Sequence, residues 1–259
     1  MSARRLVPCL DVTEAGVVKG VRFEGLRSVG DPIALAERYD ADGADEIVLL
    51  HITATLEGRG PARGLVERLA NVLRVPLTVG GAVRSSEDAY ALLDAGADRV
   101  AVNSAALADP SLVERLAYRY GSQAVVVAVD YRSRPEDNFP VRSRAASAAT
   151  PWGLEAWLRE AGERGAGEFL LTAIDRDGTG QGYDLEGLRT ARRATALPII
   201  ASGGAGSAED VLRLFELGLA DAALLASRLH DGSLGLRELR RTLYERGVHV
   251  RWDDWTRTA

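Results

Sequence analysis

Short apolar runs alternate with amphipathic stretches along the whole chain, a pattern typical of repeated strand–helix units. The runs are mostly continuous, as expected for parallel strands that helices cover on the outside. We expect strands at 5–10, 46–51, 76–81, 98–103, 124–130, 167–172, 197–202 and 221–226. Eight such units predict an α/β fold, a (β/α)8 TIM barrel.

Polar residues mark where several of the intervening helices begin. Asp31 and Asp109 each precede a proline, and we expect each to cap a helix whose first residue is that proline. Ser85 and Ser207 are each followed three residues later by an aspartate, which is close to a capping box.

The chain also repeats itself with a period of about 120 residues, which is structural evidence in its own right. The echoed pairs are Asp11 with Asp130, Gly80-Gly81 with Gly203-Gly204, and Asn103-Ser104 with Ala226-Ser227. This repeat predicts one barrel domain over residues 1–259, built from half-barrels at about 1–120 and 121–250. An open doubly wound sheet, the alternative architecture, leaves the repeat unexplained.

Composition excludes several classes of protein. The single cysteine, Cys9, rules out an intrachain disulfide and favours a reducing cytoplasm. We expect no signal peptide and no membrane span, because no apolar run is long enough. A net charge of −5 argues against nucleic-acid binding, and the three histidines show no metal-ligand spacing, so we expect neither metal nor cofactor.

In a barrel of this type the active site lies at the carboxyl ends of the strands. Asp11 and Asp130 follow apolar strands there, in equivalent positions of the repeat. Two such carboxylates divide general-acid and general-base roles when their surroundings separate their pKa values. The alternative is that both are ordinary turn aspartates.

The same edge is rich in glycine and hydroxyl groups. The two Gly-Gly pairs allow close approach of backbone N–H groups to a phosphate, and helix N-termini follow them. Because these features occur twice, they predict a substrate with two phosphates. Lys19 lies in the long connection from Asp11 to Asp31, where we expect a lid, and Asp177 lies in a polar loop after the sixth strand. Each feature also has an alternative without a ligand. The glycine pairs then only turn the chain, Lys19 is a solvated surface lysine, and the loop that contains Asp177 is an ordinary hydrogen-bonded turn.

Charged residues also stand at the opposite end of the barrel, where strands begin: Arg5, Glu46, Arg99 and Glu168. They form either ordinary rim salt bridges, each adding roughly 0–1 kcal/mol, or a closed ring that gates the barrel axis. The sequence leaves both possibilities open.

An ordered set of motifs resembles the cyclase subunit of imidazole glycerol phosphate synthase, the HisF type, from about residue 4 to 251. The motifs are Pro8–Asp11, Val17–Gly20, Gly30–Pro32, Ile52–Ala54, Thr78–Gly81, Gly121–Ala128, Asp175–Thr179 and Ile200–Gly206. The resemblance implies a histidine-pathway reaction in which ammonia from a separate glutaminase subunit attacks a phosphoribulosyl-formimino carboxamide ribotide. The products are imidazole glycerol phosphate and aminoimidazole carboxamide ribotide.

The resemblance also implies roles for individual residues. Asp11 and Asp130 match the acid/base pair, and Lys19 matches a mobile loop over the site. Residues implied to bind substrate or its phosphates are Lys19, Gly81, Ala82, Asn103, Ser104, Thr172, Asp177, Gly178, Gly203, Gly204 and Ser227. The charged ring matches the ammonia entrance where the glutaminase docks, with Arg99 in place of the usual lysine.

Four features depart from the family pattern, and we expect all of them on the catalytic side. His51 replaces an aspartate, Ala82 a glycine and Ala173 a serine or similar residue, and segment 142–150 lacks a glycine pair. They keep two alternatives open: a diverged paralogue that delivers ammonia in a specialised pathway, and the sister isomerase of the histidine pathway. The Pro8–Asp11 motif and Lys19 favour the cyclase.

Overall fold

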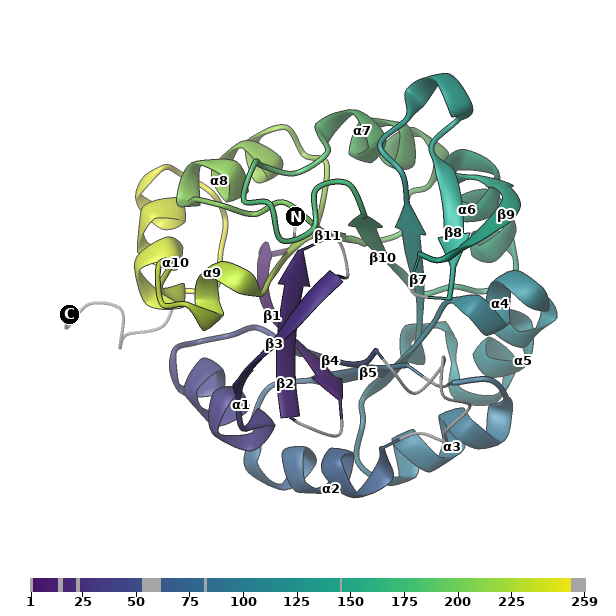
Figure 1. The fold of residues 1–259 in the computed structure, drawn as a ribbon, viewed down its shortest axis with the longest axis horizontal. Helices are drawn as coiled ribbons and strands as arrows, with labels where there is room; N and C mark the ends of the chain where they lie inside the picture. Colours follow the sequence, from purple (N-terminus) through teal and green to yellow (C-terminus); the bar gives the residue numbers. More distant parts are fainter. Residues whose placement is uncertain are drawn as a thin grey trace.

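The computed structural model describes residues 2–13, 16–21, 24–52, 62–81, 83–144 and 146–252. Eight parallel strands form a closed barrel in the order β10, β11, β12, β1, β4, β5, β6 and β7, and β7 pairs with β10 to complete it. The strands are β1 (Arg5–Thr13), β4 (Ile47–His51), β5 (Leu77–Gly80), β6 (Arg99–Val102), β7 (Val125–Tyr131), β10 (Glu168–Ala173), β11 (Ile199–Ser202) and β12 (Ala222–Leu225). The predicted TIM barrel is confirmed (Figure 1).

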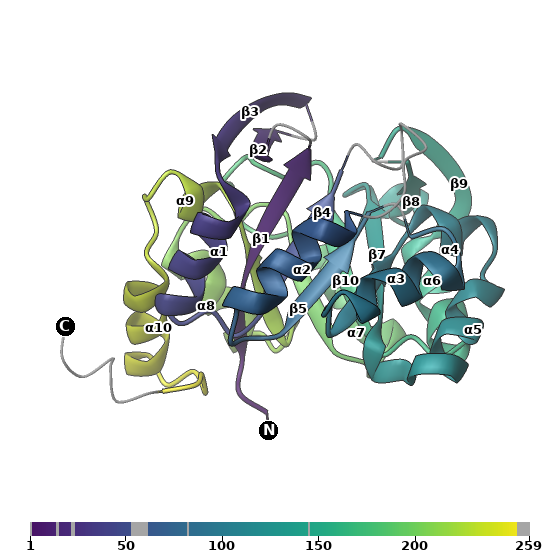
Figure 2. The ribbon, with the colours of Figure 1, turned by 90° about the horizontal axis from the view of Figure 1, so that it is seen from below.

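Two antiparallel hairpins extend the barrel, one in each half of the repeat. β2 (Gly16–Val21) and β3 (Glu24–Gly30) follow β1, while β8 (Pro140–Ser143) and β9 (Ala148–Gly153) follow β7. Both hairpins rise from the same end of the barrel, opposite the N-terminus (Figure 2). The connection between Asp11 and Asp31, where we expected a lid, therefore contains regular structure, because β2 continues the ladder from β1 by pairing with Val12 and Thr13.

Helices lie between successive barrel strands in the sequence and cover the outside of the barrel (Figure 1). They are α1 (Pro32–Ala41), α2 (Arg63–Val72), α3 (Ser86–Asp94), α4 (Ser104–Ala108), α5 (Ser111–Tyr120), α6 (Leu154–Glu163), α7 (Leu185–Ala194), α8 (Ala208–Glu216), α9 (Ser227–His230) and α10 (Leu236–Glu245), with short 3-10 turns at Ser122–Ala124 and Pro135–Asp137. None of the helices in the described ranges is long and apolar enough to cross a membrane.

The predicted helix caps are mostly confirmed. The Asp31 carboxylate accepts hydrogen bonds from the backbone N–H groups of Ile33 and Ala34, and Ser207 forms a complete capping box with Asp210. Asp109 is the exception, because α5 starts one residue later than expected and Pro110 is its cap. The Asp109 carboxylate still accepts the N–H of Ser111, so it satisfies a backbone donor at this helix start.

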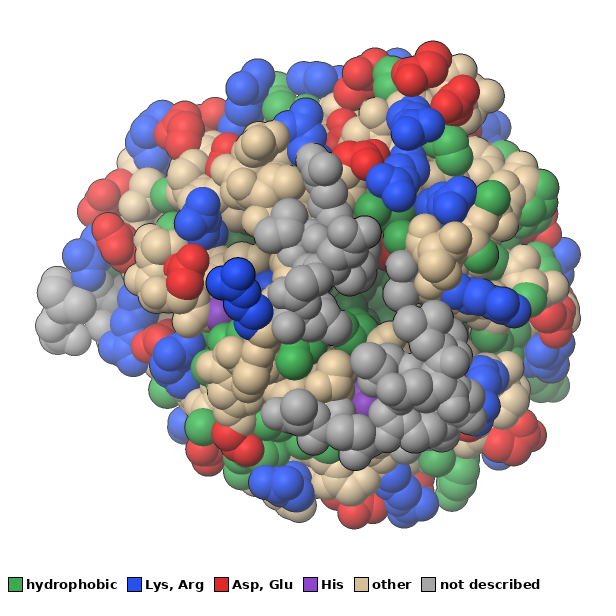
Figure 3. All heavy atoms as spheres, viewed as in Figure 1, with side chains coloured by type: hydrophobic (Ala, Val, Ile, Leu, Met, Phe, Trp, Pro, Cys, Tyr) green, Lys and Arg blue, Asp and Glu red, His purple; other side chains and the backbone are tan. Residues whose placement is uncertain are grey.

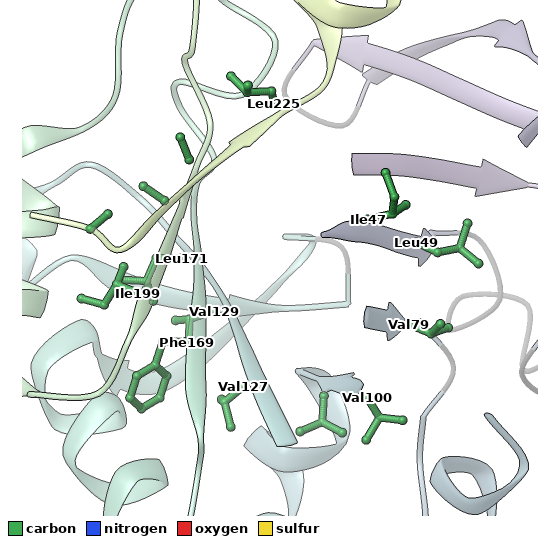
Figure 4. Close-up of a cluster of buried hydrophobic side chains, with 14 of the residues drawn as sticks. Ile47, Leu49, Val79, Val100, Val127, Val129, Phe169, Leu171, Ile199 and Leu225 are labelled. Atoms are coloured by element: carbon green, nitrogen blue, oxygen red, sulfur yellow. The ribbon is translucent and has the colours of Figure 1, made fainter. Parts of the chain in front are cut away.

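Strand residues alternate between two apolar cores. Side chains such as Leu49, Val127, Phe169 and Leu171 point outward and pack beneath the helices (Figure 4). A second cluster, which includes Val7, Cys9, Val48, Val126 and Leu170, fills the barrel interior.

The two glycine pairs of the repeat correspond in the structure with an offset of one residue from their sequence match. Gly81 and Gly203 both have φ of 89°. A Cβ atom on either would lie 2.3 or 2.6 Å from a carbonyl oxygen of the preceding strand, that of His51 or Ala173. Gly81 is therefore the structural counterpart of Gly203, whereas the sequence match had paired it with Gly204. Only glycine fits this combination of backbone angle and close approach.

Candidate active site

A cavity of about 820 Å³ opens at the carboxyl ends of the barrel strands. Predicted residues that line it come from both halves of the repeat: Asp11, Lys19, His51, Gly81, Asn103, Ser104, Asp130, Thr172 and Asp177. Figure 3 looks down on this face and shows the hollow, with Lys and Arg side chains around part of its rim. One cavity thus collects most of the side chains that the sequence singled out.

Lys19 joins two carboxylates at one side of this cavity. Its Nζ atom lies 2.9 Å from Oδ2 of Asp11 and 3.2 Å from Oδ1 of Asp177. The β2–β3 hairpin brings Lys19 over the mouth, because β2 folds back antiparallel to β1. All three side chains are mostly buried, so solvent screens their attraction weakly.

These contacts shift the pKa values of two members of the group. Burial by itself lowers the pKa of Lys19, but the carboxylates of Asp11 and Asp177 outweigh it and raise that pKa. Burial raises the pKa of Asp177, and the nearby Lys19 opposes that rise. Lys19 is therefore a fixed positive charge near neutral pH, held between two acidic groups.

Asp130 occupies a different environment in the same cavity. The Nδ2 group of Asn103 donates a hydrogen bond to its Oδ2 atom over 2.9 Å. Burial, followed by the charge of Asp177, raises the pKa of Asp130 to about 7. The two aspartates therefore have different environments. Asp11 contacts a lysine, whereas Asp130 is protonated in a substantial fraction of the molecules at neutral pH.

The Asn103-Ser104 turn joins Asp130 to the β8–β9 hairpin. The Oδ1 atom of Asn103 is buried and has no hydrogen-bond partner among the described residues. The Oγ atom of Ser104 accepts a hydrogen bond from the backbone N–H of Arg144 over 2.8 Å. This turn therefore lines the cavity with polar groups, and one of them, Oδ1 of Asn103, has no hydrogen-bond donor among the described residues.

Gly178, Gly203, Gly204 and Ser227 were also predicted to bind phosphate, but they are not among the residues that line this cavity. The loop after β10 instead packs on the loop after β11, where the N–H of Gly182 donates to the carbonyl of Gly204 over 2.7 Å. Gly178, Gly203 and Gly204 all have positive φ. Gly204 therefore lies against the loop after β10, outside the cavity lining.

The departures in the described ranges differ in their relation to the cavity. Ala173 is the last residue of β10 and so lies at the catalytic end of the barrel, but its side chain is buried in the core cluster beneath the helices and does not line the cavity. Ala82 lies outside the described residues. His51 does line the cavity, and residues 143, 144 and 148–150 of the altered segment line it as well.

Sequence reasoning missed Arg84 and Ser202 of the cavity wall, and it included Ser143, Arg144 and Thr150 only as members of the altered segment 142–150. Ser202 had a usable signal, because it is the last residue of a predicted barrel strand. An arginine in a loop carries no such signal, and only the path of the chain brings Arg84 and Arg144 to the cavity.

At the other end of the barrel the four predicted charged residues form a closed ring of ion pairs. Arg5 and Arg99 each contact both Glu46 and Glu168, with Arg5 Nη1 2.7 Å and Arg99 Nη2 2.5 Å from Oε2 of Glu46. Thr78 Oγ1 donates to Glu46 over 2.6 Å. Isolated rim salt bridges, the alternative prediction, are therefore excluded for these four residues.

Burial affects the two members of the ring with shifted pKa values. The side chain of Glu46 is inaccessible to solvent, and burial raises its pKa against the opposing effects of Arg99 and Arg5. Burial lowers the pKa of Arg5, but the charges of Glu168 and Glu46 outweigh it and raise that pKa. In this ring the attraction between two arginines and two glutamates offsets the cost of burying their charges at the N-terminal end of the barrel.

An apolar layer separates this ring from the acids at the mouth. Along β1 the inward side chains run from Arg5 through Val7 and Cys9 to Asp11, and along β10 from Glu168 through Leu170 to Thr172. Small side chains such as Ala101 and Ala222 belong to the same layer. The barrel axis is therefore charged at one end, apolar in the middle and polar at the other end.

Within the described ranges no three His, Cys, Asp or Glu residues are grouped closely enough to hold a metal ion.

The chain is similar to proteins of known families. The histidine biosynthesis protein family matches residues 5–235. A protein of Myxococcus xanthus named imidazole glycerol phosphate synthase subunit HisF is 50% identical over 251 residues, which cover 97% of this chain and 99% of that protein. Proteins of the same name are 49% identical in Metallosphaera sedula, covering 97% of this chain and all of that protein, and 47% identical in Wolinella succinogenes, covering 96% and 98%.

Proposed function

The chain belongs to the histidine biosynthesis protein family and, within it, to the HisF subunits of imidazole glycerol phosphate synthase, and we propose that its upper cavity carries out the ammonia-dependent cyclisation. The substrate is the phosphoribulosyl-formimino carboxamide ribotide. The products are imidazole glycerol phosphate and aminoimidazole carboxamide ribotide. One observation carries this proposal: Asp11 and Asp130 line the same cavity in different environments, Asp11 in contact with Lys19 and Asp130 buried with a raised pKa.

Asp130 is the general acid in this proposal. Its pKa of about 7 means that the protonated form is well populated at neutral pH and still gives up its proton readily. Asn103 is a positioning residue, because its amide fixes one oxygen of Asp130 and leaves the other oxygen to face the substrate. The proton goes to the oxygen that leaves as water when ammonia condenses with the ribulosyl carbonyl.

Asp11 is the general base. It takes a proton from nitrogen as the imidazole ring closes and the bond to the aminoimidazole ribotide breaks. Its Oδ2 atom lies 2.9 Å from Nζ of Lys19, which holds the carboxyl group in place at the cavity wall. Lys19 holds the hairpin over the cavity, and substrate entry then requires this ion pair to rearrange.

Ammonia reaches the cavity from the ring end of the barrel. The apolar layer favours neutral ammonia over ammonium, because an unpaired charge is costly to bury among apolar side chains. The glutaminase subunit docks at this N-terminal end, and the ring of Arg5, Glu46, Arg99 and Glu168 is the gate. Of the two phosphates, one binds near Gly81, Asn103 and Ser104, and the other near Gly178, Gly203, Gly204 and Ser227.

The direct test is an assay of the isolated protein with the ribotide and an ammonium salt, followed by the appearance of both products. Turnover that depends on both ammonia and ribotide supports the proposal. Absence of turnover with a folded protein, together with ammonia-independent isomerisation of the ribotide's aldose precursor, favours the sister isomerase instead.

A further inference from the structure

Three side chains that the proposed mechanism does not use meet where α1 contacts α9. The two helices lie side by side (Figure 2), and Arg38 and Tyr39 of α1 reach the carbonyl of Leu229 and the ring of His230 in α9. α1 follows directly on the β2–β3 hairpin that carries Lys19, and α9 follows barrel strand β12. This junction therefore joins the hairpin over the cavity to the end of a barrel strand.

The hydrogen bonds at this junction run in one direction. Nη2 of Arg38 donates to Oη of Tyr39 over 3.0 Å, since a guanidinium group has only donors. The same Oη atom lies 2.7 Å from Nδ1 of His230, which is the one acceptor that the buried Tyr39 hydroxyl has among the described residues. The hydroxyl therefore donates its hydrogen to Nδ1, and Nδ1 carries no proton of its own.

This direction fixes the state of the imidazole. A ring with an unprotonated Nδ1 is neutral and carries its one proton on Nε2. Burial lowers the pKa of His230 to about 4, and the charge of Asp11 opposes that shift. The charges of Lys19 and Arg38 lower it further. The hydrogen bonds and the surrounding charges therefore agree on a neutral ring near neutral pH.

The neutral ring lies close to the contact between Asp11 and Lys19. The charges of both residues act on it, and the backbone carbonyl of Cys9, two residues before Asp11 on β1, acts in the same direction as Asp11. A protonated His230 would place another cation beside Asp11. It would compete with Lys19 for that carboxyl group and would repel the Lys19 ammonium directly.

We propose that Arg38 and Tyr39 hold His230 as a neutral imidazole with its proton on Nε2, and that His230 is thereby a positioning residue. It leaves Lys19, rather than an imidazolium, as the cation that Asp11 contacts, and so it keeps the β2–β3 hairpin over the cavity. The inference rests on the proposed function only where it concerns turnover, because it assigns a supporting role beside the proposed base.

The composition of the chain makes the state of His230 directly observable. The chain has three histidines, and Lys19 is its single lysine. Long-range ¹H–¹⁵N spectra of the labelled wild type report which ring nitrogen is protonated, and His51→Gln and His249→Gln assign the signals. We expect the neutral Nε2–H tautomer of His230 from about pH 6 to about pH 8. A charged ring or an Nδ1–H tautomer in this range would overturn the proposal.

Tyr39→Phe tests the hydrogen-bond chain. It removes the hydroxyl that donates to Nδ1 and keeps the ring on which Arg38 lies, with the guanidinium carbon 4.8 Å from the ring centroid. We expect His230 to gain a population of the Nδ1–H tautomer. The control is Tyr118→Phe, which removes the hydroxyl of an exposed tyrosine on α5. An unchanged tautomer in folded Tyr39→Phe contradicts the role of Tyr39.

His230→Gln and His230→Arg compare a neutral with a charged side chain at the same place. The readout is the exchange of the Lys19 Nζ hydrogens with water, which needs no turnover. We expect exchange to be at least about 10-fold faster in His230→Arg than in His230→Gln, because the added cation frees Lys19 from Asp11. Tm shows whether each variant folds, and Tyr39→Phe, which adds no bulk, is expected to exchange at an intermediate rate. Equal exchange in all three folded variants contradicts the positioning role.

Turnover separates this inference from the proposed function. Ammonia-dependent kcat is expected to fall at least about 5-fold in His230→Arg and less than about 2-fold in His230→Gln. His249→Gln, which changes an exposed histidine, is expected to match the wild type. A wild type without cyclase activity that still shows the neutral tautomer and the exchange difference contradicts the reaction and supports the role of His230. An active wild type whose variants exchange equally contradicts the role of His230 alone.

Discussion

The Nζ atom of Lys19 lies 2.9 Å from Oδ2 of Asp11, and this contact ties a hairpin of the first half-barrel to one of the three aspartates that line the cavity. Asp177 of the second half-barrel shares the same lysine. The contact therefore holds β2 across the mouth of the cavity and fixes the Asp11 carboxyl group beside a positive charge.

Lys19→Met is expected to lower ammonia-dependent kcat by about 10-fold or more, because positioned proton-transfer sites lose efficiency when their charge environment is removed. Lys19→Arg keeps the charge and should retain more activity. Rate measurements at saturating ribotide and ammonium compare the two. Full activity in Lys19→Met would remove this residue from the mechanism.

The pH dependence distinguishes an acid role for Asp130 from a base role. Its raised pKa of about 7 means that the acid form is present below that pH and is lost as the pH rises through it. With free ammonia held constant, kcat/KM is therefore expected to fall above about pH 7.

Asp130→Glu should retain this limb of the profile, and Asp130→Asn should lose it. A rate that instead rises through the same pH range would make Asp130 the base and contradict its proposed role as the general acid.

The ring at the foot of the barrel gives a prediction about nitrogen source. Arg99→Lys keeps the charge but loses the planar geometry with which Arg99 contacts Glu46 and Glu168 together. Charge reversal at Arg99 or Glu168 is more disruptive, because breaking a buried ion pair costs about 3–5 kcal/mol.

All three variants are expected to lose more glutamine-dependent activity, measured with the glutaminase subunit, than ammonia-dependent activity. The Tm of each variant serves as the control for folding. Equal losses with both nitrogen sources at an unchanged Tm would contradict the gate.

His51 gives a prediction about divergence. It lines the cavity, and its backbone is fixed between Val12 of β1 and the close approach of Gly81. A carboxylate in this place only accepts hydrogen bonds near neutral pH, whereas imidazole also donates them. If the histidine weakens or redirects the cyclase, His51→Asp should raise ribotide turnover several-fold.

The opposite result is equally informative. An efficient wild type that loses activity in His51→Asp would show that the histidine is an accommodated part of this site, and it would remove the argument for a specialised paralogue.

The barrel was predictable because each buried parallel strand is a continuous apolar run bounded by polar residues. The predicted starts and ends of all eight barrel strands lie within three residues of the observed ones. The two hairpins were not predicted as strands, since neither turn carries a strong Asn-Gly or Asp-Gly signal. The turn containing Arg144 and Ala146 instead places side-chain-bearing residues at positive φ, which no local pattern announces.

The acids were predictable for a similar reason. Asp11 and Asp130 stand at the ends of strands, so the barrel itself determines where they lie. Arg84 and Arg144 lie on connections, and their arrival at the cavity depends on how those connections fold. The ion-pair ring falls between these cases: strand starts located its four residues, but only the structure shows that they close on one another.

Ammonia-dependent turnover of the ribotide by the wild type, Asp11→Asn and Asp130→Asn tests the central claim most directly. Asparagine keeps the shape of each side chain and removes its proton transfer, so each variant should fold and lose at least about 10²-fold in kcat. Circular dichroism and Tm establish that the fold is retained. Near wild-type turnover in either folded variant would contradict the assignment of the two aspartates as the acid and base of the cyclase.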